Sequence, residues 1–294
     1  MPLKLLKSLA ATALAVGALG WVVTRPMPLP ASSFDGLAGD VAQGEAVFWA
    51  AGCASCHTAP GVEETDEPVL AGGQAFPSPF GTFHAPNISP DPVYGIGNWT
   101  VTDLGNALLR GVSPEGSHYY PAFPYTAYTH LQPADVADLR AYLLTLPASS
   151  SPSQPHDMPF PFNIRRSNGV WKWLYLRSDW VLKTAATPEV ERGRYLVEGL
   201  GHCAECHTPR TPLGGLDIKN WMKGAPNPSG PGRIPAIHPD DLKWTEAEIA
   251  YYLETGFTPD FDSAGGHMAR VVSNFARLPK SDREAVAAYL KALP

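Results

Sequence analysis

Cys53-Ala54-Ser55-Cys56-His57 and Cys203-Ala204-Glu205-Cys206-His207 are the two stretches that decide the fold of this chain of 294 residues. Each has the pattern C-x-x-C-H, and together they use all four cysteines. This pattern is the attachment signature of c-type haem, in which the two thiols form thioethers and the adjacent histidine becomes an axial ligand of the iron. We therefore predict two covalently bound haem c groups and a role in moving electrons.

Other uses of the cysteines explain less. A single zinc ion held by both pairs would need zinc-ribbon spacing, whereas the pairs lie far apart in the sequence. A thioredoxin-type redox pair would need a βαβ context, and the sequence shows none. Disulfides do not account for a histidine directly after both pairs.

An internal repeat surrounds the two motifs. A helical run leads into each motif, at residues 44–52 and 193–202, and a glycine-rich turn follows. Trp99 begins a helical stretch that reaches Gly111, and Trp244 begins one of equal length that reaches Gly256. Each half then closes on a short amphipathic helix, predicted over residues 135–146 and 281–293. The sequence thus predicts two copies of one helical haem module.

Composition limits the partners. The chain has 31 prolines and 27 glycines but only 17 % charged residues, which suits small domains built around a cofactor. The net charge of −6 argues against a nucleic-acid partner, because it provides no basic surface for phosphates.

The order of helix, C-x-x-C-H, glycine-rich loop, helix, ligand loop and closing helix resembles the class I cytochrome c fold. The resemblance covers residues 38–147 (haem 1) and 188–294 (haem 2), and it implies a mainly α protein with two tandem domains. Residues 81–88, 119–125 and 159–165 are similar to segments of membrane-bound dihaem cytochromes and of the cytochrome c subunits of periplasmic dehydrogenases. Those subunits usually have three haem modules, and this chain has two.

The N-terminus predicts the compartment. Lys4 and Lys7 precede an apolar run from about Leu9 to Val23, which is typical of an export signal or a membrane anchor. We favour a retained transmembrane anchor over residues 1–25, followed by a stiff linker over 26–37; the alternative is a signal cleaved on export. Both place the haem domains in the bacterial periplasm, on the outer face of the inner membrane when the anchor is kept.

The axial ligands are predicted from spacing. His57 and His207, which close the two motifs, are the proximal ligands. The sixth ligand of a class I domain is usually a methionine in the loop before the closing helix, and Met268 lies in that loop of the second module.

The first module differs, since no methionine occurs between residues 28 and 157. The tryptophan-to-glycine register places Phe123 opposite Met268. His118 is our preferred ligand because its spacing from His57 equals that of Met268 from His207. His130, Met158 and an open iron are the alternatives. Axial methionine raises the potential of haem iron relative to axial histidine. If haem 1 is His/His and haem 2 is His/Met, electrons would run from the first module to the second.

Two functional classes remain. Residues 148–187, rich in aromatic residues and proline, form a connector that we expect to pack against both domains. The preferred function is a membrane-tethered electron carrier or a dehydrogenase subunit, with a dehydrogenase as donor and an oxidase or soluble cytochrome as acceptor. The alternative is a haem enzyme, such as a dihaem peroxidase or a thiosulfate-oxidising cytochrome, which would use an open or unusually ligated haem 1.

Overall fold

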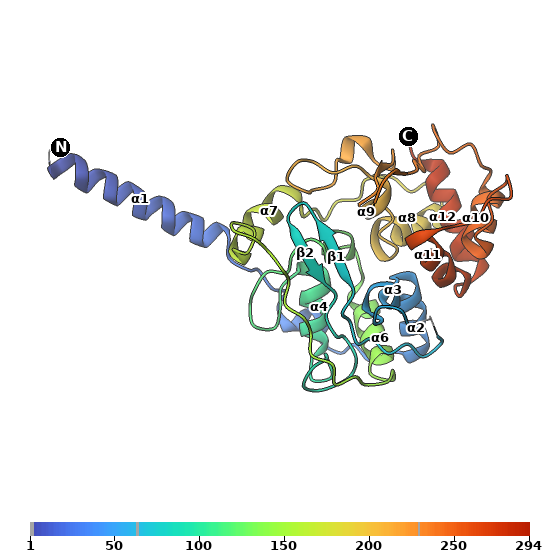
Figure 1. Ribbon diagram of the computed structural model, residues 1–294, viewed down its shortest axis with the longest axis horizontal. Helices are drawn as coiled ribbons and strands as arrows, with labels where there is room; N and C mark the ends of the chain where they lie inside the picture. The colour runs from blue at the N-terminus through green and yellow to red at the C-terminus, as the bar shows by residue number, and fades with distance from the viewer. Residues whose placement is uncertain (1–2, 63–64, 229) are drawn as a thin grey trace.

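A computed structural model describes residues 3–62, 65–228 and 230–294 of the chain. The described residues are mainly helical, as predicted (Figure 1). They also contain two small antiparallel sheets, each of two strands: β1 (Ala75–Ser78) with β2 (Gly81–His84), and β3 (Ala225–Pro226) with β4 (Arg233–Ile234). Each sheet lies in the loop that follows one C-x-x-C-H motif.

The two halves have matching element orders. The first half contains α2 (Val41–Ala50), α3 (Cys53–His57), α4 (Val101–Arg110), α5 (Tyr125–Tyr128) and α6 (Pro133–Leu143). The second contains α8 (Pro188–Arg194), the π-helical η3 (Tyr195–Leu200), α9 (Ala204–His207), η4 (Ile218–Asn220), α10 (Glu246–Thr255), α11 (Gly266–Ala276) and α12 (Lys280–Ala292). The repeat read from the sequence is therefore a repeat of structure.

The first and last helices of each half cross at a glycine. A Cβ placed on Gly44 of α2 would lie 2.0 Å from the carbonyl oxygen of Asp138 in α6. A Cβ on Gly193 of α8 would lie 1.9 Å from the carbonyl oxygen of Ala285 in α12. Only glycine permits so close a backbone approach, and both crossings pack against a tyrosine, Tyr142 or Tyr289.

The middle helix of each half has the same start and stop signals. Thr100 and Thr245 form capping boxes with Asp103 and Glu248 at the third helical position. Gly111 and Gly256 end α4 and α10 in the left-handed conformation. These local signals explain why the tryptophan-to-glycine distance is the same in both halves.

The connector packs against both halves, since Trp171 and Val181 donate hydrogen bonds to Leu213 and Glu198 of the second half. It contains η2 (Arg165–Ser167) and α7 (Asn168–Tyr175). Lys172 of α7 is buried and donates to the carbonyl oxygens of Arg110 and Gly111, both at 2.6 Å. Phe34 of η1 (Ala31–Phe34) packs against Gly105 of α4, where a Cβ would lie 2.1 Å from the Phe34 ring.

The N-terminal helix α1 (Leu3–Val23) extends away from the body of the protein (Figure 1). Its side chains at Leu14, Leu19 and Trp21 are largely exposed. In the part of the chain that the structure describes, no helix is both long enough and apolar enough to span a membrane. The predicted transmembrane segment is therefore not confirmed.

Candidate haem-binding sites

Each motif forms one short helical turn. In the first half, Gly52 adopts φ 64° and turns the chain from α2 into α3, which contains Cys53, Cys56 and His57. In the second half, His202 takes the equivalent left-handed position before α9, with φ 39°. None of the four cysteines, all of which lie in the described ranges, forms a disulfide. Both turns thus place two thiols and an adjacent imidazole in the arrangement that covalent haem requires.

The histidines of the motifs are oriented in the same way. His57 Nδ1 lies 2.8 Å from the carbonyl oxygen of Pro86, and His207 Nδ1 lies 2.8 Å from that of Pro235. Because a carbonyl oxygen only accepts, Nδ1 carries the proton and Nε2 keeps its lone pair for iron. Burial lowers the pKa of both imidazoles, which favours the neutral form that binds metal. The residues present therefore fit haem c.

The sequence alone did not identify Pro86 and Pro235 as the residues that orient the histidines, although Pro86 lies in the family-like stretch 81–88. The signal is a Pro-x-Ile sequence that follows the motif at nearly the same distance in both halves. Gly72 and Gly224 donate backbone hydrogen bonds to the carbonyl oxygens of His57 and His207, at 2.7 and 2.8 Å. Each proline loop is thereby held against its own motif.

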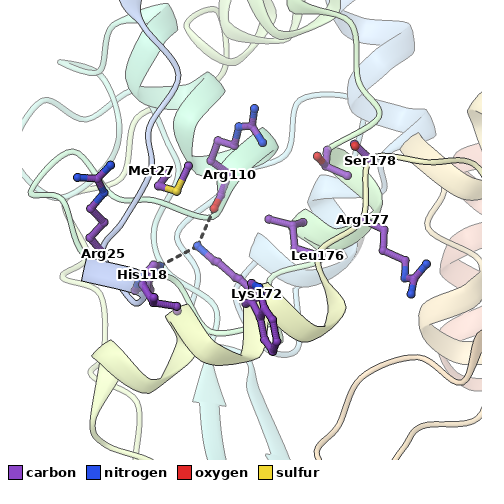
Figure 2. Close-up of a pocket in the computed structure, with 12 residues that line it drawn as sticks. Arg25, Met27, Arg110, His118, Lys172, Leu176, Arg177 and Ser178 are labelled. Carbon is purple, nitrogen blue, oxygen red and sulfur yellow. Dashed lines mark hydrogen bonds between the residues drawn. The ribbon is translucent and has the colours of Figure 1, made fainter. Parts of the chain in front are cut away.

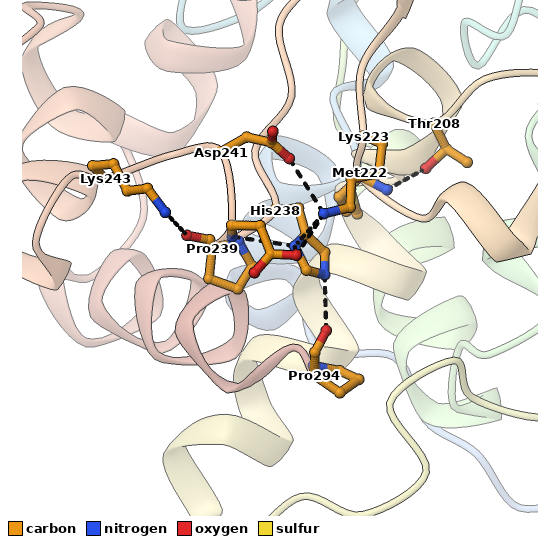
Figure 3. Close-up of polar contacts among 9 residues, drawn as sticks. Thr208, Met222, Lys223, His238, Pro239, Asp241, Lys243 and Pro294 are labelled. Atoms are coloured by element: carbon orange, nitrogen blue, oxygen red, sulfur yellow. Dashed lines mark hydrogen bonds and ion pairs between the residues drawn. The ribbon is translucent and has the colours of Figure 1, made fainter.

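In the second half, a polar cluster fixes the proline loop to the C-terminus (Figure 3). His238 is buried, and its ring bridges the carbonyl oxygen of Pro294 at 3.0 Å and Lys223 Nζ at 2.9 Å. Lys223 also pairs with Asp240 and Asp241, at 2.8 and 3.3 Å. The loop that orients His207 is therefore anchored at the far end of the domain.

In the first half, the connector has this anchoring role. Asn87 is buried and donates from Nδ2 to the carbonyl oxygens of Ser149 and Ser151, both at 2.8 Å. Its backbone nitrogen bonds to Ser153 Oγ at 2.9 Å. The start of the connector thus holds the Pro86 loop in place.

Met268 lies in the first turn of α11, half-buried against the hydrophobic core. The loop before it has a fixed register relative to α10, since Ala264 N donates to the carbonyl oxygen of Gly256 at 2.8 Å. The side chain is thus in the segment from which a class I sixth ligand is expected. Its ligand role stays a prediction.

His118 has a different setting from the one its spacing predicts. Its Nε2 lies 2.9 Å from the carbonyl oxygen of Thr24, and its Nδ1 lies 3.0 Å from Lys172 Nζ (Figure 2). The ring is buried against the base of α1 and α7, beside a cavity of about 230 Å³ lined by Arg25 and Arg110. Because both ring nitrogens are engaged, His118 offers none to iron in this arrangement.

The alternative ligands are also placed. His130 stacks on Trp180 with ring centroids 4.1 Å apart, which puts it in the contact between the connector and the first half. Met158 lies beside Gly81, at the end of the hairpin, where a Cβ on that glycine would be 2.9 Å from its sulfur. The structure does not bring either residue together with His118.

The two motifs face one another across the contact between the halves. Arg270 of α11 donates to the carbonyl oxygen of Ser55 at 2.5 Å, and Asn274 Nδ2 donates to Ser55 Oγ at 2.9 Å. From the first domain to the second motif, Thr126 of α5 donates a hydrogen bond to the carboxylate of Glu205 at 2.9 Å. Ser55 and Glu205 occupy the same place in their motifs, so each motif packs against the helix that follows the partner domain's ligand loop.

A further hydrogen bond joins the segments that precede the two motifs. His202 Nε2 also reaches the carbonyl oxygen of Ala51, at 3.3 Å. The attachment sides of both halves therefore meet at one interface.

Each of the two helical domains holds a pair of cysteines beside a histidine whose Nε2 keeps its lone pair for iron. Two such domains define a c-type cytochrome with two haems. The chain belongs to the cytochrome c family, whose pattern matches residues 41–147 and 190–294. Two haem c groups are thus its cofactors, attached through Cys53, Cys56, Cys203 and Cys206.

Relatives agree with this assignment. The chain is 55 % identical over 284 residues to a dihaem cytochrome c-type protein of Cereibacter sphaeroides, covering 97 % of this chain and 96 % of the relative. It is 36 % identical over 280 residues to a fructose dehydrogenase cytochrome subunit of Gluconobacter japonicus, covering 91 % of this chain and 54 % of that subunit. It is 33 % identical over 307 residues to the cytochrome c subunit of a quinone alcohol dehydrogenase of Gluconobacter oxydans, covering 94 % and 60 %.

The chain thus spans little more than half of these two dehydrogenase subunits, although it spans nearly all of the first relative. It is a dihaem cytochrome c, homologous to electron-transfer subunits of dehydrogenases.

Proposed function

We propose that the protein is the cytochrome subunit or dedicated electron acceptor of a periplasmic dehydrogenase. The observation that carries the proposal is the meeting of the two C-x-x-C-H turns at one interface, through Arg270, Ser55 and Glu205. When bound, each haem supplies one-electron Fe(III)/Fe(II) chemistry. Each domain donates a hydrogen bond to the motif of the other domain, and these bonds hold the two attachment sites together.

The predicted ligands give the two domains different roles. His57, His207 and Met268 are proposed to ligate iron, and an axial methionine thioether raises the potential of the haem iron that it binds. Only the second domain has a methionine in its ligand loop. The second domain is therefore the higher-potential end, and the first domain is the entry side for electrons.

The proposed partners follow from the relatives. Their names include fructose and alcohol dehydrogenases, so the donor proposed here is a dehydrogenase that oxidises a sugar or an alcohol. The acceptor is an oxidase or a soluble cytochrome. The basic start and apolar body of α1 support export to the periplasm, with the segment kept as an anchor or cleaved as a signal.

Stopped-flow absorption of the full, haem-loaded chain tests this function. A purified sugar or alcohol dehydrogenase with its substrate should reduce the cytochrome rapidly, and the reduced cytochrome should then reduce a soluble cytochrome c. A matched variant, Cys203→Ser with Cys206→Ser, should lose the second haem and the onward transfer while still accepting electrons. Haems that stay oxidised with each dehydrogenase would reject the proposal.

A further inference from the structure

The ligand loops of the two domains are built on one backbone plan. Tyr119 N donates to the carbonyl oxygen of Gly111 at 2.8 Å, as Ala264 N does to that of Gly256. One turn earlier, Ser113 pairs with Ser117 at 2.8 Å as Thr258 pairs with Asp262 at 2.9 Å. The two loops are therefore in one register, without a gap, up to Tyr119 and Ala264.

This register also places His118. An isolated bridge pairs Val112 with His118, and the equivalent bridge pairs Phe257 with Ser263. His118 is thus the counterpart of Ser263, which precedes Met268 by more than a helical turn. Both its nitrogens bond away from the loop, to Thr24 and Lys172.

Beyond the loop, the residues of the two domains correspond again, but with a shifted register. Tyr128 donates from its hydroxyl to the carbonyl oxygen of Ala51 at 3.1 Å, in front of the first motif. Phe275 lies in front of the second motif, 3.2 Å from a Cβ placed on Gly201. Tyr128 and Phe275 are therefore counterparts, and the two registers differ by two residues.

The two-residue shift lies somewhere between Tyr119 and Tyr128. Met268 therefore has only three candidate counterparts: Pro121, Ala122 and Phe123. None has a side-chain lone pair that iron could accept. Phe123 is half-buried against the core, as Met268 is. Its ring lies among those of Tyr119, Tyr125 and Tyr128, with centroids 5.6, 6.4 and 5.9 Å away.

We propose that Phe123 takes the place of the sixth ligand in domain 1, so that iron held by His57 binds a small neutral diatomic molecule such as carbon monoxide or nitric oxide there. The aromatic rings around Phe123 favour a neutral ligand over an anion, because an apolar setting disfavours a buried charge. This inference depends on the two haems but not on the identity of the dehydrogenase.

Low-temperature EPR of the oxidised full chain, combined with titration of the reduced chain with carbon monoxide, tests the proposal. We expect one high-spin and one low-spin haem, and uptake of one carbon monoxide per chain. Two low-spin haems and no uptake of carbon monoxide would overturn it, and would leave the dehydrogenase function untouched.

Reciprocal variants assign the sites. Phe123→Met should convert the high-spin signal to low spin and abolish carbon monoxide uptake, whereas Met268→Phe should make the second haem high-spin and double the uptake. His118→Gln, which keeps a polar group toward Thr24 but removes the imidazole, should leave both signals as they are. A low-spin signal that is lost in His118→Gln would overturn the proposal and restore His118 as the ligand.

Discussion

Substitution of the glycine at the helix crossing in domain 2 is the most direct test of the packing that supports the haem. In Gly193→Ala, the new methyl would lie 1.9 Å from the carbonyl oxygen of Ala285 and 2.7 Å from Tyr289 Cβ. Ordinary contact begins at 3.4 Å, so α8 and α12 would have to separate by about 1.5 Å. The opposing atom is backbone, so it cannot rotate away.

The magnitude follows from two opposing effects. Overpacking of a well-packed core costs about 1–3 kcal/mol, and this clash with backbone belongs at the upper end of that range. Alanine recovers about 1 kcal/mol of helix propensity relative to glycine. The net loss is about 2 kcal/mol, which corresponds to a fall in Tm of roughly 10 °C for a domain of this size.

Thermal unfolding of the full, haem-loaded chain, followed by near-UV circular dichroism, measures this loss. Gly199→Ala is the matched control because it lies in the same helical run, and its nearest neighbour, His130 Cβ, would be 3.7 Å from the new methyl. The control should melt at or slightly above the temperature of the unaltered protein. Equal melting of the Gly193 and Gly199 variants would refute the reasoning.

Three further predictions concern the interface, a buried acid and a helix cap. Arg270→Ala removes the hydrogen bond to Ser55 and should cost about 1–3 kcal/mol in chemical denaturation, whereas a change near zero would mean that the domains do not meet through this contact. Burial raises the pKa of Glu198 above its usual value of 4.5, so the folded state holds this proton more tightly than the unfolded chain does. The stabilisation by this proton is therefore complete below pH 4.5 and is lost as the pH rises through the raised pKa. Glu198→Gln should remove this pH dependence of Tm. Parallel plots of Tm against pH for the two proteins would contradict the argument. Thr245→Ala should lose about 1 kcal/mol of unfolding free energy with the capping box, while Thr245→Ser, which keeps the hydroxyl, should not.

Local chemistry made much of the fold predictable. The C-x-x-C-H motifs, the capping threonines and the left-handed glycines act within a few residues, so their spacing carries the element order directly. The predicted helix over 135–146 is observed as α6, Pro133–Leu143, and the one over 281–293 as α12, Lys280–Ala292. Proline at the start of α6 moves its first turn two residues earlier than the amphipathic pattern indicates.

In the N-terminal segment, local reasoning predicted a helix. A basic start followed by an apolar run predicts a membrane anchor, and the segment is indeed a helix, Leu3–Val23. Within the described ranges, no helix is both long and apolar enough to cross a membrane, so the anchor stays a prediction.

The sequence by itself determined the covalent chemistry of this protein. Four cysteines in two C-x-x-C-H motifs, each followed by its histidine, leave haem c as the cofactor, because no other site uses that combination at that spacing. The internal repeat determined that there are two such modules, since both halves carry the same short-range signals.

Only the tertiary structure decided how those modules are used. Pro86 and Pro235 orient the histidines across nearly thirty residues of chain, and the contact of Arg270 with Ser55 spans the two domains. Spacing alone cannot show where a side chain points, and His118 is the example: its distance from His57 is that of a ligand, but packing against Thr24 and Lys172 turns both nitrogens away. Such long-range contacts depend on how complete helices pack, which no local pattern encodes.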